Sequence, residues 1–223
     1  MDYILALFDF IMRIDKHLAE ITAAYGALTY IILFLIVFCE TGLVVLPILP
    51  GDSMLFAAGA IASTGSMNPH FMFLALFIAA VIGDAVNYHI GAYLGERAFD
   101  PNHFTSRFFK KQYLEKTQKF YDKYGGKTII IARFVPIVRT FAPFLAGVGG
   151  MKYRNFFIYN VTGGFLWTSL FIYAGYFFGE IPVVKRNFTL VIIAIIILSV
   201  MPAVIEYLKA RKESKKAAYE TAA

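Results

Sequence analysis

Long apolar stretches with few charged positions dominate the hydropathy pattern of the chain, and short polar segments separate them. A helix needs ~20 apolar residues to cross the hydrocarbon core of a bilayer, and four stretches come close to or exceed that length. The predicted spans lie over residues 23–39, 71–95, 155–179 and 187–207. The pattern therefore predicts an all-α, polytopic membrane protein whose membrane domain covers residues 21–208.

Residues 2–20 show a different periodicity. Apolar residues recur every three or four positions, and charged residues take the opposite helix face at Asp9, Arg13, Lys16 and Glu20. A helix with this pattern lies in the membrane interface with its apolar face toward the lipid. We therefore predict an N-terminal amphipathic helix over 1–20, ahead of the first span.

Two further apolar segments are unsuited to a continuous helix. The segment 40–60 contains two prolines followed by a glycine, and the segment 129–148 contains two prolines. Proline removes a backbone donor and breaks a helix, and broken backbone at membrane depth is tolerated only where protein or a water-filled cavity satisfies it. Each segment is therefore predicted to form a re-entrant helical hairpin.

The two halves of the chain also share a sequence pattern. Each broken segment is followed by a span that ends in Gly-x-x-x-Gly-Glu, at 91–96 and at 175–180. Paired interrupted helices in an inverted repeat indicate a transport site near the middle of the membrane. The glycines themselves are explained more simply by close helix packing. We expect two opposed hairpins related as an inverted repeat.

Composition and charge support a membrane location. Hydrophobic residues make up 59% of the chain and charged residues 16%, which excludes an ordinary soluble domain. The net charge of +6 is concentrated in the segment 96–127 and in the tail, of which 209–223 forms the basic end. The positive-inside rule places both in the cytoplasm, with both termini, and leaves Lys185 and Arg186 outside as an exception. This distribution argues against a nucleic-acid partner.

Five ionisable residues lie in or beside the apolar segments. Each would cost on the order of 3 kcal/mol at the centre of a lone spanning helix, so mutual pairing is expected. The five are Glu40, Asp52, Asp84, Arg133 and Arg139. Charges of this kind are functional candidates by default. The alternatives are an ion-pair network with a purely architectural role, or an interfacial position for Glu40.

Side-chain chemistry suggests a role for each of these five residues. Arg133 and Arg139 are candidate substrate-binding residues, because the arginine fork matches the oxygens of phosphate or carboxylate. The proline between them breaks the helix, so both could converge on one anion. Glu40 and Asp52 are titratable and could load and release protons. Asp84 could be a third proton-coupling group or a partner for arginine.

Other features of the sequence suggest no enzyme and no cofactor. The four histidines are scattered, no zinc-spaced Cys/His set occurs, and no nucleophile-elbow or nucleotide-binding signature is present. We therefore expect no metal site and no catalytic residue. Trp167 and the many Tyr and Phe residues are interpreted as lipid-facing or interfacial.

In the segments around the five ionisable residues, the chain resembles the DedA family, also called the SNARE-associated or VTT domain family. The motifs that carry the resemblance lie at residues 38–45, 49–56, 83–88 and 132–147, and the last contains Arg-Phe-Val-Pro-Ile-Val-Arg. The resemblance implies two facing re-entrant hairpins and a place in the bacterial inner membrane. It also implies that Glu40, Asp52, Arg133 and Arg139 match essential positions of the family. Family members are associated with recycling undecaprenyl phosphate by the proton motive force, and eukaryotic relatives with phospholipid scrambling.

Three functions follow, in order of preference. The first is a flippase of a lipid phosphate, undecaprenyl phosphate being the favoured substrate, driven by protons. The second is a passive phospholipid scramblase in which the charges only hydrate a groove. The third is a scaffold for membrane assembly that transports nothing. The sequence leaves the lipid, the direction, the choice between H⁺ and Na⁺, and the oligomeric state open.

Overall fold

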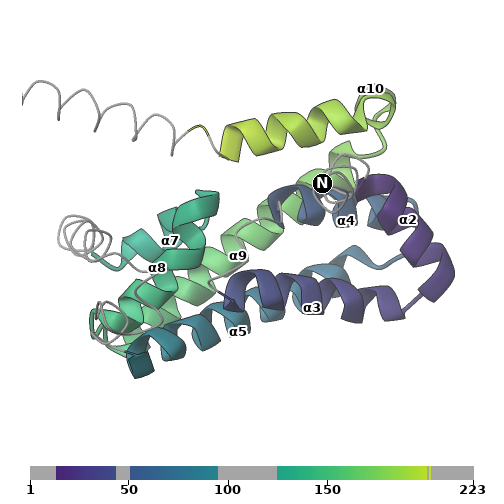
Figure 1. The fold of residues 1–223 in the computed structure, drawn as a ribbon. Coiled ribbons are helices and arrows are strands. Elements are labelled where there is room, and N and C mark those ends of the chain that lie inside the picture. Colours follow the sequence, from purple (N-terminus) through teal and green to yellow (C-terminus); the bar gives the residue numbers. More distant parts are fainter. Residues whose placement is uncertain (1–13, 44–50, 95–124, 200, 202–223) are drawn as a thin grey trace, which may run out of the picture.

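The chain folds into an assembly of helices, seen here in a computed structural model that describes residues 14–43, 51–94, 125–199 and 201. No strand occurs among these residues, which confirms the all-α class. The labelled helices are α2 Ile14–Tyr25, α3 Leu28–Gly42, α4 Gly51–Ser63, α5 Pro69–Leu94, α7 Lys127–Ala132, α8 Pro136–Val148, α9 Tyr153–Phe178 and α10 Pro182–Arg186 (Figure 1). A further apolar helix covers Phe188–Ser199.

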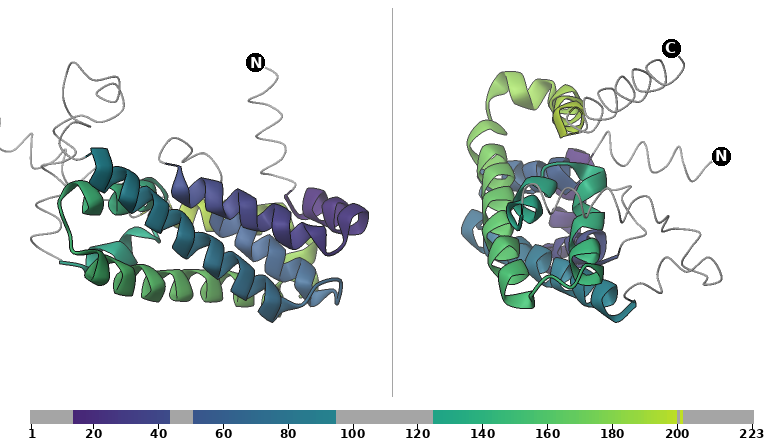
Figure 2. Two further views of the ribbon diagram at one scale, coloured as in Figure 1. Left: turned by 90° about the horizontal axis from the view of Figure 1, so that it is seen from below. Right: turned by 90° about the vertical axis from the view of Figure 1, so that its left-hand side faces the viewer.

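The helices α5 and α9 are the two longest of the described part. Each has 26 residues, so each is ~39 Å long and exceeds the ~30 Å hydrocarbon core of a bilayer. Both are apolar enough to cross a membrane, which agrees with two of the predicted spans. They pack against each other and form the frame on which the shorter helices lie (Figure 2).

The first predicted span differs from the structure. A turn at Gly26, whose φ of +53° favours glycine, separates α2 from α3. As a result α3 begins only at Leu28 and continues to Gly42, where the sequence predicted a span over 23–39. Of the predicted interfacial helix 1–20, residues 1–13 lie outside the described residues and the remainder belongs to α2.

Both broken segments contain two short helices. In the first, α3 ends at Gly42 and α4 begins at Gly51, and the two prolines of this segment lie outside the described residues. In the second, α7 ends at Ala132 and α8 begins at Pro136. Val135 is extended, with φ −120° and ψ 104°, because the proline ring after it disfavours helical backbone. The chain therefore breaks between Arg133 and Arg139, as the proline predicted.

Glycines allow close backbone contact at two crossings between helices. On the α4–α9 pair, a Cβ added at Gly59 would collide with the Ile172 carbonyl, and one at Gly175 with the Phe56 carbonyl. On the α8–α5 pair, a Cβ at Gly147 would collide with the Tyr88 carbonyl, and one at Gly91 with the Phe144 carbonyl. Gly91 and Gly175 thus serve backbone contact between helices, the simpler of the two explanations given by the sequence.

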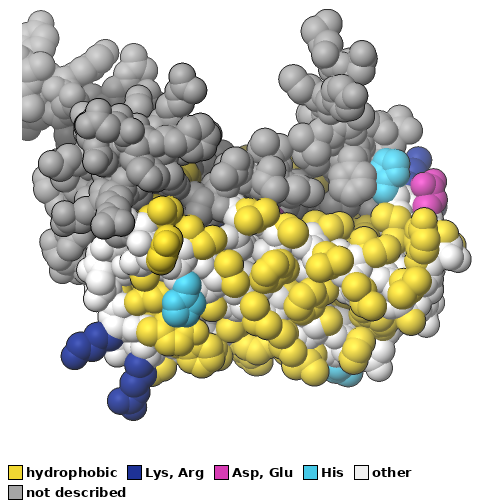
Figure 3. All heavy atoms as spheres, turned by 60° about the horizontal axis from the view of Figure 1, so that its bottom comes forward, with side chains coloured by type: hydrophobic (Ala, Val, Ile, Leu, Met, Phe, Trp, Pro, Cys, Tyr) yellow, Lys and Arg dark blue, Asp and Glu magenta, His cyan; other side chains and the backbone are white. Residues whose placement is uncertain are grey.

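Many large hydrophobic side chains are exposed on the outside of the bundle. Large hydrophobic side chains lie exposed along one face of α5, at Phe71, Leu74, Ile78, Ile82, Val86, Ile90 and Tyr93. In Figure 3 hydrophobic side chains fill the middle of the face that it shows, whereas Lys, Arg, Asp and Glu lie toward its ends. An exposed apolar belt of this kind is suited to lipid rather than to water.

Candidate functional site

All five ionisable residues singled out by the sequence are buried, within one region of the bundle. Their exposed fractions are 1% for Glu40, 4% for Asp52, 3% for Asp84, 4% for Arg133 and 8% for Arg139. The interfacial alternative for Glu40 is therefore wrong in this structure. Charges buried to this degree must be compensated by partners, and each of the five has one.

The two acids of the first broken segment meet at the N-terminus of α4. Glu40 lies in the last turn of α3, and its Oε1 accepts a hydrogen bond of 3.1 Å from the backbone N–H of Gly51, the first residue of α4. Asp52 lies in the first turn of α4. A helix N-terminus favours negative charge. A Cβ at Gly51 would lie 2.5 Å from Glu40 Oε2 and 3.0 Å from Arg139 Nη2, so a larger residue here would displace the ion pair.

Arg139 joins these two acids to the second broken segment. It projects from α8, where its Nη1 donates to Asp52 Oδ1 at 3.0 Å and its Nη2 donates to Glu40 Oε1. One guanidinium therefore bridges two carboxyl groups. The fork geometry of arginine allows this, because its donors point in fixed and separate directions.

Arg133 lies at the end of α7 and makes a second cluster with α5 and α9. Its Nη2 donates to Asp84 Oδ2 and to Asn160 Oδ1. The amide of Asn160 is itself fixed, because its Nδ2 donates to the Val81 carbonyl at 3.0 Å. The Arg133 Nε is buried and has no hydrogen-bond partner among the described residues.

Trp167 lies between the two clusters, and its predicted lipid-facing position is wrong. It is only 1% exposed, and its indole Nε1 donates to Asp52 Oδ1 at 2.8 Å. The guanidinium carbon Cζ of Arg139 lies 5.4 Å from the centroid of the indole ring, and that of Arg133 lies 6.0 Å from it. Both distances are within the range of a cation–π attraction.

Two more polar residues support the site and were missed by sequence reasoning. Asn87 on α5 donates through Nδ2 to the carbonyls of Thr41 at 3.2 Å and Thr140 at 2.8 Å, so it ties both broken segments to one helix. Ser199, from the Phe188–Ser199 helix, donates through its hydroxyl to Asp52 Oδ2. An Asn within an apolar span was the available signal for Asn87, as for Asn160.

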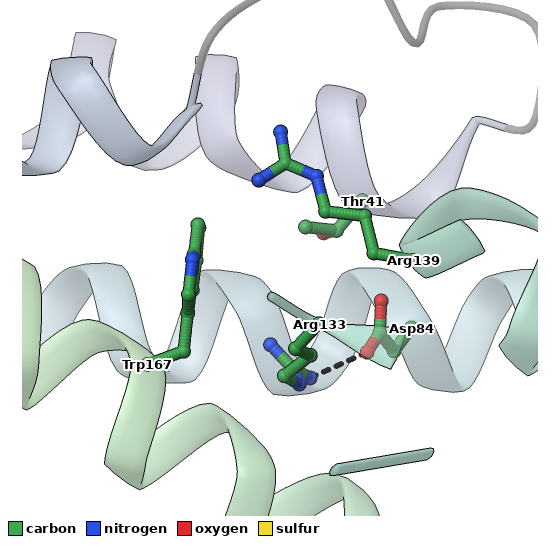
Figure 4. A pocket seen from close by; sticks show the side chains of 5 residues that line it. All are labelled: Thr41, Asp84, Arg133, Arg139 and Trp167. Carbon is green, nitrogen blue, oxygen red and sulfur yellow. Dashed lines mark hydrogen bonds and ion pairs between the residues drawn. The ribbon is translucent and has the colours of Figure 1, made fainter. Parts of the chain in front are cut away.

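A small pocket lies where the two clusters meet. It is lined by Thr41, Asp84, Arg133, Arg139 and Trp167, and its empty space is about 220 Å³ (Figure 4). Most of this space is too narrow for a molecule to enter, and the part that can hold one has room for about one water. Both arginines therefore face the same pocket, and in this conformation the acids and the indole leave no room for a larger ligand.

The charges of the site do not cancel when all five residues are ionised. Two arginines against three acids leave a net charge of −1, with Arg133 and Asp84 balanced and Arg139 shared by Glu40 and Asp52. Within the described part of the chain, no group of three or more His, Cys, Asp and Glu side chains is arranged to hold a metal ion. Arginine side chains are of the kind that binds anions, and carboxyl groups are of the kind that exchanges protons.

Comparison with known proteins places the chain in a family. A family model described as the VTT domain matches residues 49–177, more than half of the chain. The protein DedA of Escherichia coli K12 is 58% identical over 221 residues, which cover 98% of this chain and 100% of that protein. The chain belongs to the DedA family. It is a DedA-family membrane protein, as the sequence motifs indicated.

Other DedA-family relatives share less sequence. An uncharacterized membrane protein of Mycobacterium tuberculosis is 43% identical over 175 residues, covering 78% of this chain and 76% of the relative. The inner membrane protein YqjA of Escherichia coli K12 is 33% identical over 154 residues, or 69% of each chain. No solved structure matches.

Proposed function

We propose that this DedA-family protein carries a lipid phosphate across the bacterial cytoplasmic membrane, and that the proton motive force drives it. Undecaprenyl phosphate is the favoured lipid. The observation that carries the proposal is the placement of two buried arginines around one pocket, each paired with acids that can take a proton. Arginine recognises phosphate, and the acids compete with phosphate for the same arginine N–H donors.

The competition suggests how proton binding and lipid binding are coupled. While Glu40, Asp52 and Asp84 are ionised, they occupy the donors that a phosphate would need. A proton on one acid weakens its ion pair and releases a guanidinium nitrogen for a phosphate oxygen. The Arg133 Nε, a buried donor without a partner among the described residues, supplies one further donor for which no ion pair has to break.

The pocket must also open before a head group enters. It has room for about one water molecule, whereas a phosphate monoester is larger. We assign this structure to a closed conformation of the transport cycle. The head group crosses through the opened, hydrated pocket while the long chain of the lipid stays in the bilayer, so a small protein suffices.

We further propose that the two broken segments are re-entrant hairpins in an inverted repeat. The helices α4 and α8, which make up most of these segments, have 13 residues each and are therefore ~20 Å long, too short to cross a ~30 Å core. The crossings are reciprocal: α4 packs on α9 through Gly59 and Gly175 as α8 packs on α5 through Gly147 and Gly91. In this topology hairpin one enters from outside, hairpin two from inside, and both termini are cytoplasmic.

The test is head-group translocation in liposomes that contain the purified protein and a fluorescent undecaprenyl phosphate. We expect flux that increases with an imposed pH gradient and is lost in Arg139→Ala. Arg133→Lys and Arg139→Lys should also lose transport, because lysine cannot grip phosphate through two parallel hydrogen bonds. Undiminished transport by both lysine variants would contradict arginine recognition.

The two competing functions give different results in the same experiment. Equal flux without a gradient, shared by ordinary phospholipids, would establish a passive scramblase. The absence of flux for every lipid, with cellular function retained in Arg133→Gln, would establish a scaffold.

A further inference from the structure

We propose that the site carries one exchangeable proton, on Glu40 Oε2, and that Trp167 and Ser199 are positioning residues that keep Asp52 permanently ionised. This rests on the proposed function and deepens it, because it separates two acids whose roles the sequence left alike. The division follows from the hydrogen bonds that each carboxyl group receives.

Asp52 receives three donors from three different helices. Arg139 Nη1 and Trp167 Nε1 both donate to Oδ1, at 3.0 and 2.8 Å, and the Ser199 hydroxyl donates to Oδ2. Arginine and tryptophan nitrogens are donors only. A proton on Oδ1 would therefore point at the N–H groups of Arg139 and Trp167, which cannot accept it. Hydrogen bonds to a charged acceptor are also among the stronger ones. These contacts favour the ionised form of Asp52.

Glu40 has the opposite arrangement. Both of its donors, Gly51 N–H and Arg139 Nη2, converge on Oε1. Its Oε2 is buried and has no hydrogen-bond partner among the described residues. An ionised carboxylate that is buried with one bare oxygen is costly. A proton on that oxygen removes the charge and weakens the charge-assisted bond from Arg139 Nη2 to Oε1.

The charge of the whole site fits one such proton. The charged groups around Glu40 are Arg139 and Asp52, and beyond them Asp84 forms a one-to-one pair with Arg133. Three acids and two arginines leave one excess negative charge, which a single proton neutralises. Asp84 has Arg133 as its partner, whereas Glu40 and Asp52 share Arg139, so the excess negative charge falls on these two acids. Of the two, Glu40 has the buried oxygen without a hydrogen-bond partner among the described residues.

This assignment gives each nitrogen of Arg139 a separate task. Nη1 stays on Asp52 throughout, which keeps the guanidinium in place. Nη2 alternates between ionised Glu40 and the phosphate, which takes over when Glu40 becomes protonated. Loss of the proton restores the Glu40–Arg139 pair and expels the phosphate, so one proton moves per transport cycle.

The experiment is an infrared titration of the purified protein in vesicles, without any lipid substrate. The carbonyl stretch of a buried protonated carboxylic acid should appear in the wild type and titrate as one group. It should be lost in Glu40→Gln and kept in Asp52→Asn and in Asp84→Asn. A band that persists in Glu40→Gln, or that disappears in either of the other two variants instead, would overturn the assignment.

Trp167→Phe and Ser199→Ala test the positioning residues. Phenylalanine keeps an aromatic ring but removes the N–H, so Asp52 should become protonatable, and a second carboxylic acid band should roughly double the titrating amplitude. The matched control is Ser169→Ala on α9, whose hydroxyl donates to the Leu166 carbonyl of its own helix, at 3.2 Å. A purely structural role would lower thermal stability in Trp167→Phe and Ser199→Ala without adding a band. Since the titration needs no transport, its result is independent of whether the lipid proposed above is the right one.

Discussion

The Arg133–Asp84 pair offers the sharpest test of whether the buried charges are architecture or function. The perturbation is a double-mutant cycle with Asp84→Leu, Arg133→Met and the double variant. The two side chains are 5% and 4% exposed, so each single change leaves the other charge buried with no opposite charge beside it. Asn160 would remain as a neutral partner of Arg133, which cannot replace the lost charge.

The magnitude follows from this burial. Removing one partner of a buried ion pair costs about 3–5 kcal/mol, whereas replacing both by apolar residues of similar size is often neutral or stabilising. We therefore expect each single variant to lose about 3–5 kcal/mol of unfolding free energy and the double variant to regain most of it. The coupling energy should exceed about 3 kcal/mol, or roughly a hundredfold in the unfolding equilibrium.

The assay is reversible unfolding in mixed micelles, followed by circular dichroism, with liposome transport measured on the same four proteins. The control cycle uses Lys185 and Glu180, whose atoms Nζ and Oε2 lie 2.8 Å apart but whose side chains are 62% and 43% exposed. An exposed pair contributes at most about 1 kcal/mol, so its coupling should be small. Additive losses in the Arg133–Asp84 cycle would refute the reasoning from burial.

Transport in the same double variant separates the two roles. If Arg133 binds the lipid phosphate, the variant that regains stability should remain inactive. If the network is only architectural, stability and transport should return together. The result therefore decides between the two explanations that the sequence left open for these charges.

Four other substitutions test the surrounding structure. Gly51→Ala should reduce transport by about tenfold or more (about 1.4 kcal/mol), because its Cβ would lie 2.5 Å from Glu40 Oε2. Its helix content, measured by circular dichroism, should stay normal. Asn87→Leu should cost about 1–3 kcal/mol in the micelle assay, since it removes two buried hydrogen bonds. Gly59→Ala and Gly147→Ala should each cost about 1–3 kcal/mol by forcing two backbones apart. Clearly unequal losses of unfolding free energy in Gly59→Ala and Gly147→Ala would contradict the equivalence of the α4–α9 and α8–α5 crossings.

The charged part of the site was predictable because charge is expensive in an apolar segment. Glu40, Asp52 and Arg139 stand out in the sequence for this reason alone, and the structure brings them into one ion-pair cluster. The long spans over α5 and α9 were predictable for the complementary reason, since length and hydropathy decide whether a helix crosses a bilayer.

The neutral parts of the site were not predictable in the same way. Tryptophan is equally suited to an interface and to a core where its N–H finds an acceptor, so hydropathy does not distinguish the two for Trp167. Ser199 lies 147 residues from Asp52, and no local pattern links them. The turn at Gly26 depends on a positive φ, which hydropathy does not report. Each of these features depends on a tertiary contact or on a single dihedral angle.

The two arginines of the site differ in a way that suggests the order of events. Arg133 has one acid and one amide, so its charge is balanced and its position is fixed by two helices. Arg139 has two acids, and therefore the excess negative charge belongs to its cluster. In the proposed mechanism, a proton driven by the membrane potential neutralises that cluster first. Opening should thus begin at Glu40 and Arg139, with Arg133 acting as the fixed half of the anion site.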